Sequence, residues 1–271
     1  MMQITNTQKV LDREKYWNEE YVRYWKARVN EANKSMSNTS ILIAGDTKTI
    51  ADDIYANAIA FLQINKTEKV LELGCGFGRS LSFLCHLASH VFAVDISKEM
   101  IKAAKENCHD INVYFFVAPS ERLPFDKDAF DTVICFAVFD ATYQLETLME
   151  INRVCKEGGR VLITGKNDNY CDDDNAALAA EIGARKKNHP NYFTDVNLLL
   201  KNMRGFGFEI ADQKFFVRRG DFAKQEYTRD LPPFFYEYQF ILKKKHTCKL
   251  SEPVIISHHY SKTYSRMKST L

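Results

Sequence analysis

The sequence predicts an α/β protein whose mostly parallel sheet of seven strands is covered by helices on both faces. Three observations lead to this fold class. Short apolar runs alternate with stretches of helical periodicity between residues 69 and 164, a rhythm typical of parallel strands joined by crossover helices. A glycine-rich turn at residues 74–78 directly follows the first run. Two later runs rich in aromatic residues, 208–211 and 236–242, are typical of closing strands.

Each element is placed by the spacing of its apolar residues, continuous or alternating for strands and recurring every three or four positions for helices. The expected strands are 69–73, 91–94, 113–117, 132–137, 160–164, 208–211 and 236–242. The expected helices are 10–33, 47–62, 79–88, 98–107, 145–155, 175–187 and 195–203. The predicted domains are an N-terminal helical lid (1–64), a core (65–245) with an insert at about 166–206, and a polar C-terminal tail (246–271).

Composition excludes several classes of protein. The formal charge of +2 on 271 residues is too even for a nucleic-acid-binding surface, so no nucleic-acid partner is expected. No window approaches eighteen uncharged apolar residues, which argues against a membrane span. The first twenty residues lack the apolar segment of a secretory signal. The seven cysteines contain no C-x-x-C pair, which favours a reduced cytoplasmic compartment and gives no sign of a bound metal.

The strongest motif is the run Val70-Leu-Glu72-Leu-Gly74-Cys-Gly76-Phe-Gly78-Arg-Ser80, in which a strand passes through three alternating glycines into a helix. A ligand can lie against backbone only where side chains are absent, and glycine accepts the φ values of a tight turn. The following helix directs free N–H groups at such a ligand. A turn of this kind without a ligand remains the alternative.

The context of the motif narrows the choice. The spacing G-x-G-x-G differs from the G-x-G-x-x-G of dinucleotide-binding proteins, and Glu72 stands two positions before the first glycine. The second strand ends at Asp95, whose carboxylate can accept both hydroxyls of a ribose; a simple helix N-cap is the alternative. Further segments follow in order at 118–125, 130–134 and 154–163. Together these motifs resemble the class I S-adenosylmethionine-dependent methyltransferases of small molecules, over about residues 67–165.

The resemblance implies a Rossmann-like fold, S-adenosylmethionine as cofactor and S-adenosylhomocysteine as product. Asp95 would bind the ribose and Ile96 the adenine face, and Glu72 would anchor the glycine loop. The family often has an aspartate or asparagine for adenine where this chain has Pro119, so Ser120 and Glu121 would fill that role. The implied cofactor set is Glu72, Gly74, Cys75, Gly76, Gly78, Asp95, Ile96, Met100, Ser120, Glu121 and Phe136, with Tyr16 and Tyr24 from the N-terminal aromatic stripe near the sulfonium.

The acceptor side is less defined. The Asn-Pro-Pro-Tyr signature for amino groups of bases and glutamine is absent, and Asp140 and Tyr143 stand in its place. They are candidate catalytic residues, with a surface loop and helix cap as the alternative. His189, in the insert expected to cover the acceptor, is the candidate general base because histidine titrates in the useful range. Loop structure is its alternative. Substrate-binding candidates are Asn167, Tyr170 and, for a carboxylate, Arg28.

We expect a methyltransferase of a small polar metabolite, with oxygen rather than nitrogen as the acceptor atom. The whole chain resembles methyltransferases of bacterial sugar, capsule or secondary-metabolite pathways. Two alternatives stay open. One is a C-methyltransferase of the quinone-tailoring type, which predicts an apolar acceptor pocket against which the polar loop 167–174 argues. The other is a non-catalytic protein that keeps the fold and a nucleoside ligand. The chain is expected to act as a monomer or a homodimer.

Overall fold

The computed structural model describes residues 12–23, 50–250, 252 and 254–268, with only the backbone given at 50–53. The chain divides into two compact units, Met1–Ser120 and Glu121–Leu271. This division differs from the expected one, because the boundary falls inside the expected core and residues 246–268 belong to the second unit. Among the described residues, no helix combines the length and the apolar character needed to cross a lipid bilayer.

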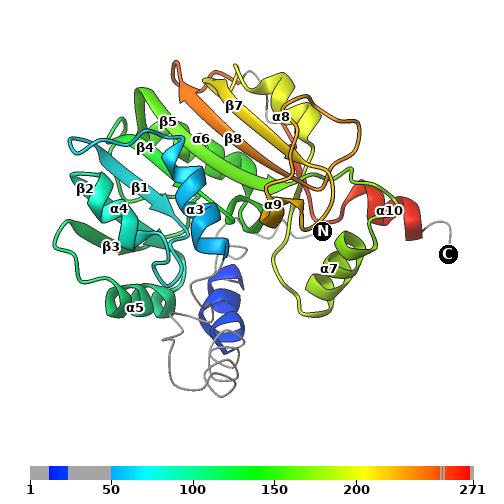
Figure 1. Ribbon diagram of the computed structural model, residues 1–271, viewed down its shortest axis with the longest axis horizontal. Helices are drawn as coiled ribbons and strands as arrows, with labels where there is room; N and C mark the ends of the chain where they lie inside the picture. Colours follow the sequence, from blue (N-terminus) through cyan, green and yellow to red (C-terminus); the bar gives the residue numbers. More distant parts are fainter. Residues whose placement is uncertain (1–11, 24–49, 251, 253, 269–271) are drawn as a thin grey trace. The chain divides into compact units, whose positions relative to one another are not determined.

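The first unit is a three-stranded parallel sheet with helices (Figure 1). Its strands are β1 (Lys69–Leu73), β2 (His90–Asp95) and β3 (Val113–Val117), in the order β3-β2-β1. Its helices are α3 (Ile50–Ala60), α4 (Leu81–Leu87) and α5 (Lys98–Asn107), with the π-helical turn η1 (Tyr16–Glu20) inside the helical stretch 12–23. β1 is buried at every position after Lys69, as expected for a strand with neighbours on both faces.

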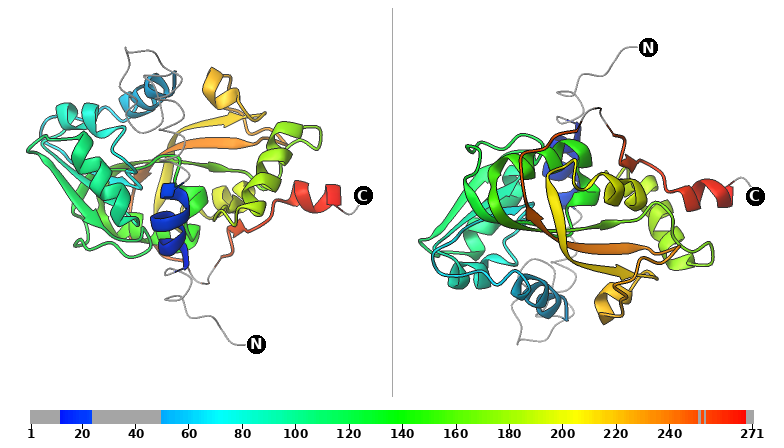
Figure 2. Two further views of the ribbon diagram at one scale, coloured as in Figure 1. Left: turned by 90° about the horizontal axis from the view of Figure 1, so that it is seen from below. Right: turned by 90° about the horizontal axis from the view of Figure 1, so that it is seen from above.

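The second unit is a four-stranded mixed sheet, whose strands β5, β8 and β7 lie side by side in both views of Figure 2. The strands are β4 (Phe130–Cys135), β5 (Cys155–Lys166), β7 (Phe208–Phe216) and β8 (Glu237–Lys244). β4 pairs with β5 in parallel, and β8 is antiparallel to both of its neighbours. The helices are η2 (Phe139–Ala141), α6 (Gln144–Val154), α7 (Asn175–Lys186), α8 (Val196–Asn202) and α9 (Asp221–Lys224).

The strand order confirms the predicted fold class. The seven strands follow the order β3-β2-β1-β4-β5-β8-β7, and only β8 runs against its neighbours. The seven predicted strands are all present, and an additional two-stranded sheet joins β6 (Phe193–Thr194) to β9 (Ser257–His258). The predicted N-terminal helix is confirmed for residues 12–23.

Part of the expected polar C-terminal tail forms regular structure. Residues 257–268 form β9 and α10 (Lys262–Lys268), and α10 lies beside α7 in Figure 1. Ser261 is fully buried, and its N–H and hydroxyl donate to the two carboxylate oxygens of Glu181 at 3.0 and 2.6 Å. The buried polar groups of Ser261 are thus satisfied inside the protein, which is the condition for burying them.

Candidate cofactor and acceptor sites

The glycine turn after β1 has the backbone geometry that the motif predicts. Gly76 has φ +54°, and a Cβ atom built there would meet no atom within 4 Å. Gly78 has φ +89°, and a Cβ there would lie 3.0 Å from Leu81 Cδ1 and 3.4 Å from Ala104. The left-handed φ values favour glycine at both positions. Gly78 therefore allows close packing on α5, whereas Gly76 leaves bare backbone open to a ligand.

Asp95 connects this turn to the end of β2. Its Oδ2 accepts the N–H of Gly76 at 2.9 Å, and its Oδ1 accepts the N–H of Ser97 at 2.8 Å. The N-cap of α5 is the side chain of Ser97, which accepts the N–H of Met100. The N-cap of α5 is therefore two residues after Asp95, at Ser97. Each carboxylate oxygen keeps a further lone pair, so the group can still accept two ribose hydroxyls.

Glu72 lies beneath the turn and is 5% exposed. One carboxylate oxygen, Oε1, accepts the hydroxyl of Ser80. The other, Oε2, is one of the few buried side-chain polar atoms in the described part of the chain that have no hydrogen-bond partner. Because a buried unpaired oxygen is costly, this atom indicates a place for a hydrogen-bond donor or a cation from outside the chain.

The electrostatics of the turn agree with a cationic ligand. Burial raises the pKa of Glu72 from 4.5 to about 7, and the neighbouring Asp95 raises it further. Burial also raises the pKa of Asp95 from 3.8 to about 6, against the N–H groups of Ser97 and Gly76, which lower it. A cation bound nearby would stabilise both carboxylates. The orphaned oxygen, the open side of Gly76 and the two buried carboxylates thus fit a ligand that carries a ribose and a positive charge.

The other predicted cofactor residues of the first unit have mixed environments. Ile96 is half-buried and follows Asp95 directly, whereas Met100 is 4% exposed and Cys75 5%. Gly74, at φ +66°, begins the turn. Ser120 is half-buried in the segment after β3. Met100 therefore contributes at least to the packing of α5, and its contact with adenine stays a prediction.

The N-terminal helix supplies a contact that the sequence did not predict. Asn18 Oδ1 accepts the hydroxyl of Ser97 at 3.0 Å and the N–H of Glu99 at 3.4 Å, which holds the helix against the start of α5. Tyr16 is half-buried, with its ring 5.2 Å from that of Trp17. Tyr24 and Arg28 lie outside the described residues. A polar residue within an aromatic stripe was the only signal for Asn18.

In the second unit, charged groups gather at the carboxyl end of β5. Lys166 Nζ lies 2.6 Å from Asp140 Oδ2 and donates to Asn191 Oδ1 at 3.1 Å. Burial would lower the pKa of Lys166, yet Asp140 holds that pKa above its ordinary value. The backbone carbonyl of Asp140 accepts the N–H of Tyr192 at 2.7 Å. Asp140 is thus paired within a partly buried network.

Glu237 belongs to the same network and was missed by sequence reasoning. It is the register partner of Lys166 across β5 and β8, so the two side chains lie on the same face of the sheet. Burial raises the pKa of Glu237 from 4.5 to about 7, while Lys166 opposes this shift. Only the pairing of β8 with β5, which are far apart in the sequence, places Glu237 beside Lys166.

The charges of this network also act on the pKa of His189. Burial lowers the pKa of His189 from 6.5 to about 4, and Lys166 lowers it further, against Asp140. The imidazole is therefore neutral near pH 7, but a weaker proton acceptor than a carboxylate whose pKa is about 7. The role of His189 as a base stays a prediction, with Glu237 as its competitor.

Three further predicted residues belong to the second unit. Tyr143 precedes α6, its N–H donates to Glu121 Oε1 at 2.7 Å, and its ring lies 5.5 Å from that of Tyr192. Glu121 therefore has one carboxylate oxygen committed to the start of α6. Phe136 follows β4, is 5% exposed and packs its ring 5.7 Å from Phe222 in α9.

The structure corrects the two substrate-binding candidates on the loop after β5. Tyr170 has no exposed surface, its hydroxyl donates to Glu181 at 2.8 Å, and its ring packs on Tyr236 and Phe193. Asn167 is 4% exposed and donates its amide to two backbone carbonyls. Both side chains hold the loop together and are turned away from solvent.

Comparison with known proteins shows what this chain resembles. Residues 71–163 match the family model of a methyltransferase domain. The chain is 37% identical over 98 residues to a demethylmenaquinone methyltransferase of Clavibacter sepedonicus, covering 35% of this chain and 40% of that protein. It is 31% identical over 119 residues to a ubiquinone/menaquinone biosynthesis C-methyltransferase of Wigglesworthia glossinidia brevipalpis, covering 41% and 48%. The chain therefore matches less than half the length of these relatives.

Solved structures show a likeness in fold over a longer part of the chain. A methyltransferase solved with the Haloferax volcanii Trm112 activator has a TM-score of 0.58 at 19% identity, over 78% of this chain and 100% of that one. The [4+2]-cyclase SpnF has a TM-score of 0.54 at 18% identity, over 72% and 82%. At such identities the likeness shows the fold alone, and the cyclase is a reminder that one fold carries several chemistries.

Proposed function

We propose that this chain is an S-adenosylmethionine-dependent methyltransferase of small molecules, and that it methylates a hydroxyl oxygen of a polar acceptor. The observation that carries the cofactor assignment is the unpaired, buried Oε2 of Glu72 beside the open backbone of Gly76 and the carboxylate of Asp95. S-adenosylmethionine supplies a methyl group already activated on a positive sulfur.

The residues of the first unit would bind and orient the cofactor. Asp95 would accept the two ribose hydroxyls with its remaining lone pairs, while its present bonds to Gly76 and Ser97 keep the carboxylate in one orientation. Glu72 would accept the ammonium of the methionine moiety, directly or through water. The half-buried Ile96 would pack on the adenine. Methyl transfer depends mainly on alignment, and these contacts supply it.

The residues of the second unit would bind the acceptor and take its proton. Oxygen methylation removes a proton from the acceptor hydroxyl, and an effective base has a pKa near the operating pH. Glu237, with a pKa of about 7, meets this condition better than His189. Lys166, held by Asp140, would keep a positive charge beside the base and orient a polar acceptor.

Carbon methylation of a quinol-like ring is the second candidate. The curated relatives named above act in quinone biosynthesis according to their names, and Phe136 and Phe222 offer aromatic surface. The polar loop 167–174 argued against this chemistry, and the burial of Asn167 and Tyr170 weakens that argument, although Asp172 and Asp173 of the loop are exposed. The charged groups around Lys166 favour the polar acceptor.

The test has two stages. Calorimetric titration with S-adenosylhomocysteine comes first, and no binding at millimolar ligand would refute the cofactor assignment. Labelled methyl transfer to a panel of hydroxylated metabolites and quinols follows, with the methylated atom identified by NMR. A carbon-methylated quinol would replace the oxygen proposal, and cofactor binding without transfer to any acceptor would favour a nucleoside-binding protein.

Glu237→Gln separates the base from a structural role. It should leave cofactor affinity unchanged, lower kcat at least about tenfold and remove the rise of kcat near pH 7. His189→Ala is the matched comparison. A profile that keeps its rise near pH 7 in Glu237→Gln but loses it in His189→Ala would transfer the role to His189.

A further inference from the structure

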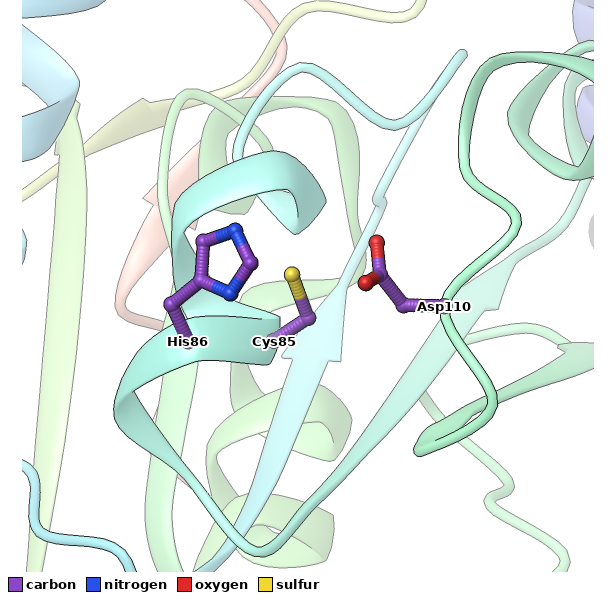
Figure 3. Close-up of side chains that lie close together, drawn as sticks. All are labelled: Cys85, His86 and Asp110. Atoms are coloured by element: carbon purple, nitrogen blue, oxygen red, sulfur yellow. The ribbon is translucent and has the colours of Figure 1, made fainter.

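A group of metal-binding side chains lies in the first unit at the end of α4 (Figure 3). Cys85 Sγ, a ring nitrogen of His86 and a carboxylate oxygen of Asp110 all lie within 4.8 Å of one another. Figure 3 shows Cys85 between His86, its neighbour on the helix, and Asp110, which comes from the loop before β3. Three ligand types from two separate segments thus converge on one point.

A second thiol approaches the same carboxylate. Cys108 follows the last residue of α5, and its Sγ lies 3.5 Å from Asp110 Oδ2. In a tetrahedral zinc site with Zn–S near 2.3 Å and Zn–O near 2.0 Å, a sulfur and an oxygen ligand are about 3.5 Å apart. The Cys108–Asp110 pair already has this separation. Cys85, His86 and Asp110 have ligand atoms within 4.8 Å of one another, and rotation of the exposed His86 and Asp110 side chains can bring these atoms closer together.

We propose that Cys85, His86, Cys108 and Asp110 bind one zinc ion that ties the end of α4 to the loop between α5 and β3. Two thiolates, one imidazole and one carboxylate are ligands that zinc accepts in tetrahedral geometry, and the sulfur donors disfavour magnesium and calcium. Four protein ligands fill the coordination sphere, as in structural zinc sites. The proposal is independent of methyl transfer, because the group lies at the amino ends of the strands, whereas Asp95 and the glycine turn lie at their carboxyl ends.

The two thiols of this group are buried next to Asp110. Cys85 and Cys108 are each 6% exposed. Burial raises the pKa of Cys85 to about 11, and Asp110 beside it raises that pKa further; burial likewise raises the pKa of Cys108. Zinc binds the thiolate form of cysteine, so metal binding displaces the thiol proton. Binding of one Zn²⁺ would form two Zn–S bonds and release two protons to the solvent.

The second cluster of such residues is different. Asp168, Asp195 and His258 also bring ligand atoms within 4.8 Å of one another. The ammonium of Lys262 lies 3.0 Å from Asp168 and 2.7 Å from Asp195, so a cationic side chain already balances these carboxylates. No corresponding ammonium is paired with Asp110 among the ion pairs of the described residues.

The test measures metal directly. Reduced protein is freed of metal with a chelator, dialysed and titrated with Zn²⁺ in the presence of a chromophoric competitor and a pH indicator. One zinc per chain with release of two protons is expected. Titration with Co²⁺ should give a thiolate-to-cobalt charge-transfer band and the intense visible bands of tetrahedral cobalt.

Variants assign the ligands. Cys85→Ser should weaken zinc binding at least about 100-fold, and His86→Ala and Asp110→Asn, at exposed positions, should do so without loss of folding. Cys248→Ser, a cysteine of the second unit, is the matched control and should bind zinc normally. Zinc binding that is absent, or equal in wild type and Asp110→Asn, would overturn the proposal, as would a Cys85–Cys108 disulfide in protein kept under reducing conditions.

Discussion

Replacing Asp95 by alanine tests the cofactor site most directly. The carboxylate is 9% exposed and has two oxygens that each keep a lone pair beyond the bonds from Gly76 and Ser97. Each charge-assisted hydrogen bond to a ribose hydroxyl is worth about 1.5–3 kcal/mol. Losing two should cost about 3–6 kcal/mol, which raises the Kd for S-adenosylhomocysteine by about 10²–10⁴-fold.

The same substitution also loosens the turn, so the two effects need separation. Ser97→Ala is the control because it removes the N-cap of α5 but leaves the carboxylate of Asp95 in place. It should lower the free energy of unfolding by about 1 kcal/mol and change the Kd by less than about threefold. Asp95→Ala should instead change mainly the Kd.

Calorimetry with S-adenosylhomocysteine and with its 2′-deoxy analogue completes the assay. If Asp95 accepts the ribose hydroxyls, removing the 2′-hydroxyl should weaken binding to the wild type far more than to Asp95→Ala. An unchanged Kd in a folded Asp95→Ala protein would refute the ribose assignment. Equal sensitivity of both proteins to the deoxy analogue would refute it as well.

Three further predictions use other parts of the chain. Gly78→Ala should lower the free energy of unfolding by about 1–3 kcal/mol, because Gly78 has a positive φ and close neighbours. Gly183→Ala, at a position with open space in α7, should leave that free energy unchanged or raise it by up to about 1 kcal/mol. Urea unfolding of both variants measures the two changes, and equal changes would contradict the prediction. Glu181→Ala removes the acceptor of the buried donors on Tyr170 and Ser261 and should lower the free energy of unfolding by about 3 kcal/mol. The control Glu226→Ala, at an exposed position, should cause no measurable change. The same thermal midpoint in both variants would show that the hydrogen bonds to Glu181 contribute little stability. Burial raises the pKa of Glu72 in the folded chain from 4.5 to about 7, so the folded chain binds a proton that the unfolded chain releases. The free energy of unfolding should therefore fall by on the order of 1–3 kcal/mol as the pH rises from about 4.5 to 7. Glu72→Gln should flatten this dependence in unfolding curves at pH 5 and 8, and an equally steep dependence in the variant would refute the shifted pKa.

The first unit could be predicted closely because its signals are local. β1, α5 and β3 have the expected bounds, since each is a continuous apolar or periodic stretch between polar or glycine residues. The spacing of Gly74, Gly76 and Gly78 was likewise enough to predict the turn after β1. Asp95 and Glu72 could be placed beside the glycine turn because Asp95 ends β2 and Glu72 stands two positions before Gly74; their contacts with a cofactor stay predictions.

The second unit was predicted less well because its contacts are distant in sequence. β5 begins at Cys155, five residues before the expected start, because Gly158 and Gly159 lie inside the strand. α10 reads as a polar tail until its partner Glu181 is known. Glu237 becomes a site residue only through its pairing with Lys166, 71 residues earlier in the chain. No window of sequence contains these pairs.

The contacts of α10 also set an order of events during synthesis. Tyr170 and Thr263 exchange two hydrogen bonds across 93 residues, and Ser261 reaches Glu181 across 80. A nascent chain that has emerged only as far as β8 therefore has the buried Glu181 without its serine partner. The second unit can complete its interior only when residues 257–268 have left the ribosome. The strands and helices of the first unit have left the ribosome much earlier and can fold before then. A translational pause before residue 257 would prolong the time during which the interior of the second unit is exposed to solvent, and a chaperone would bind this exposed interior.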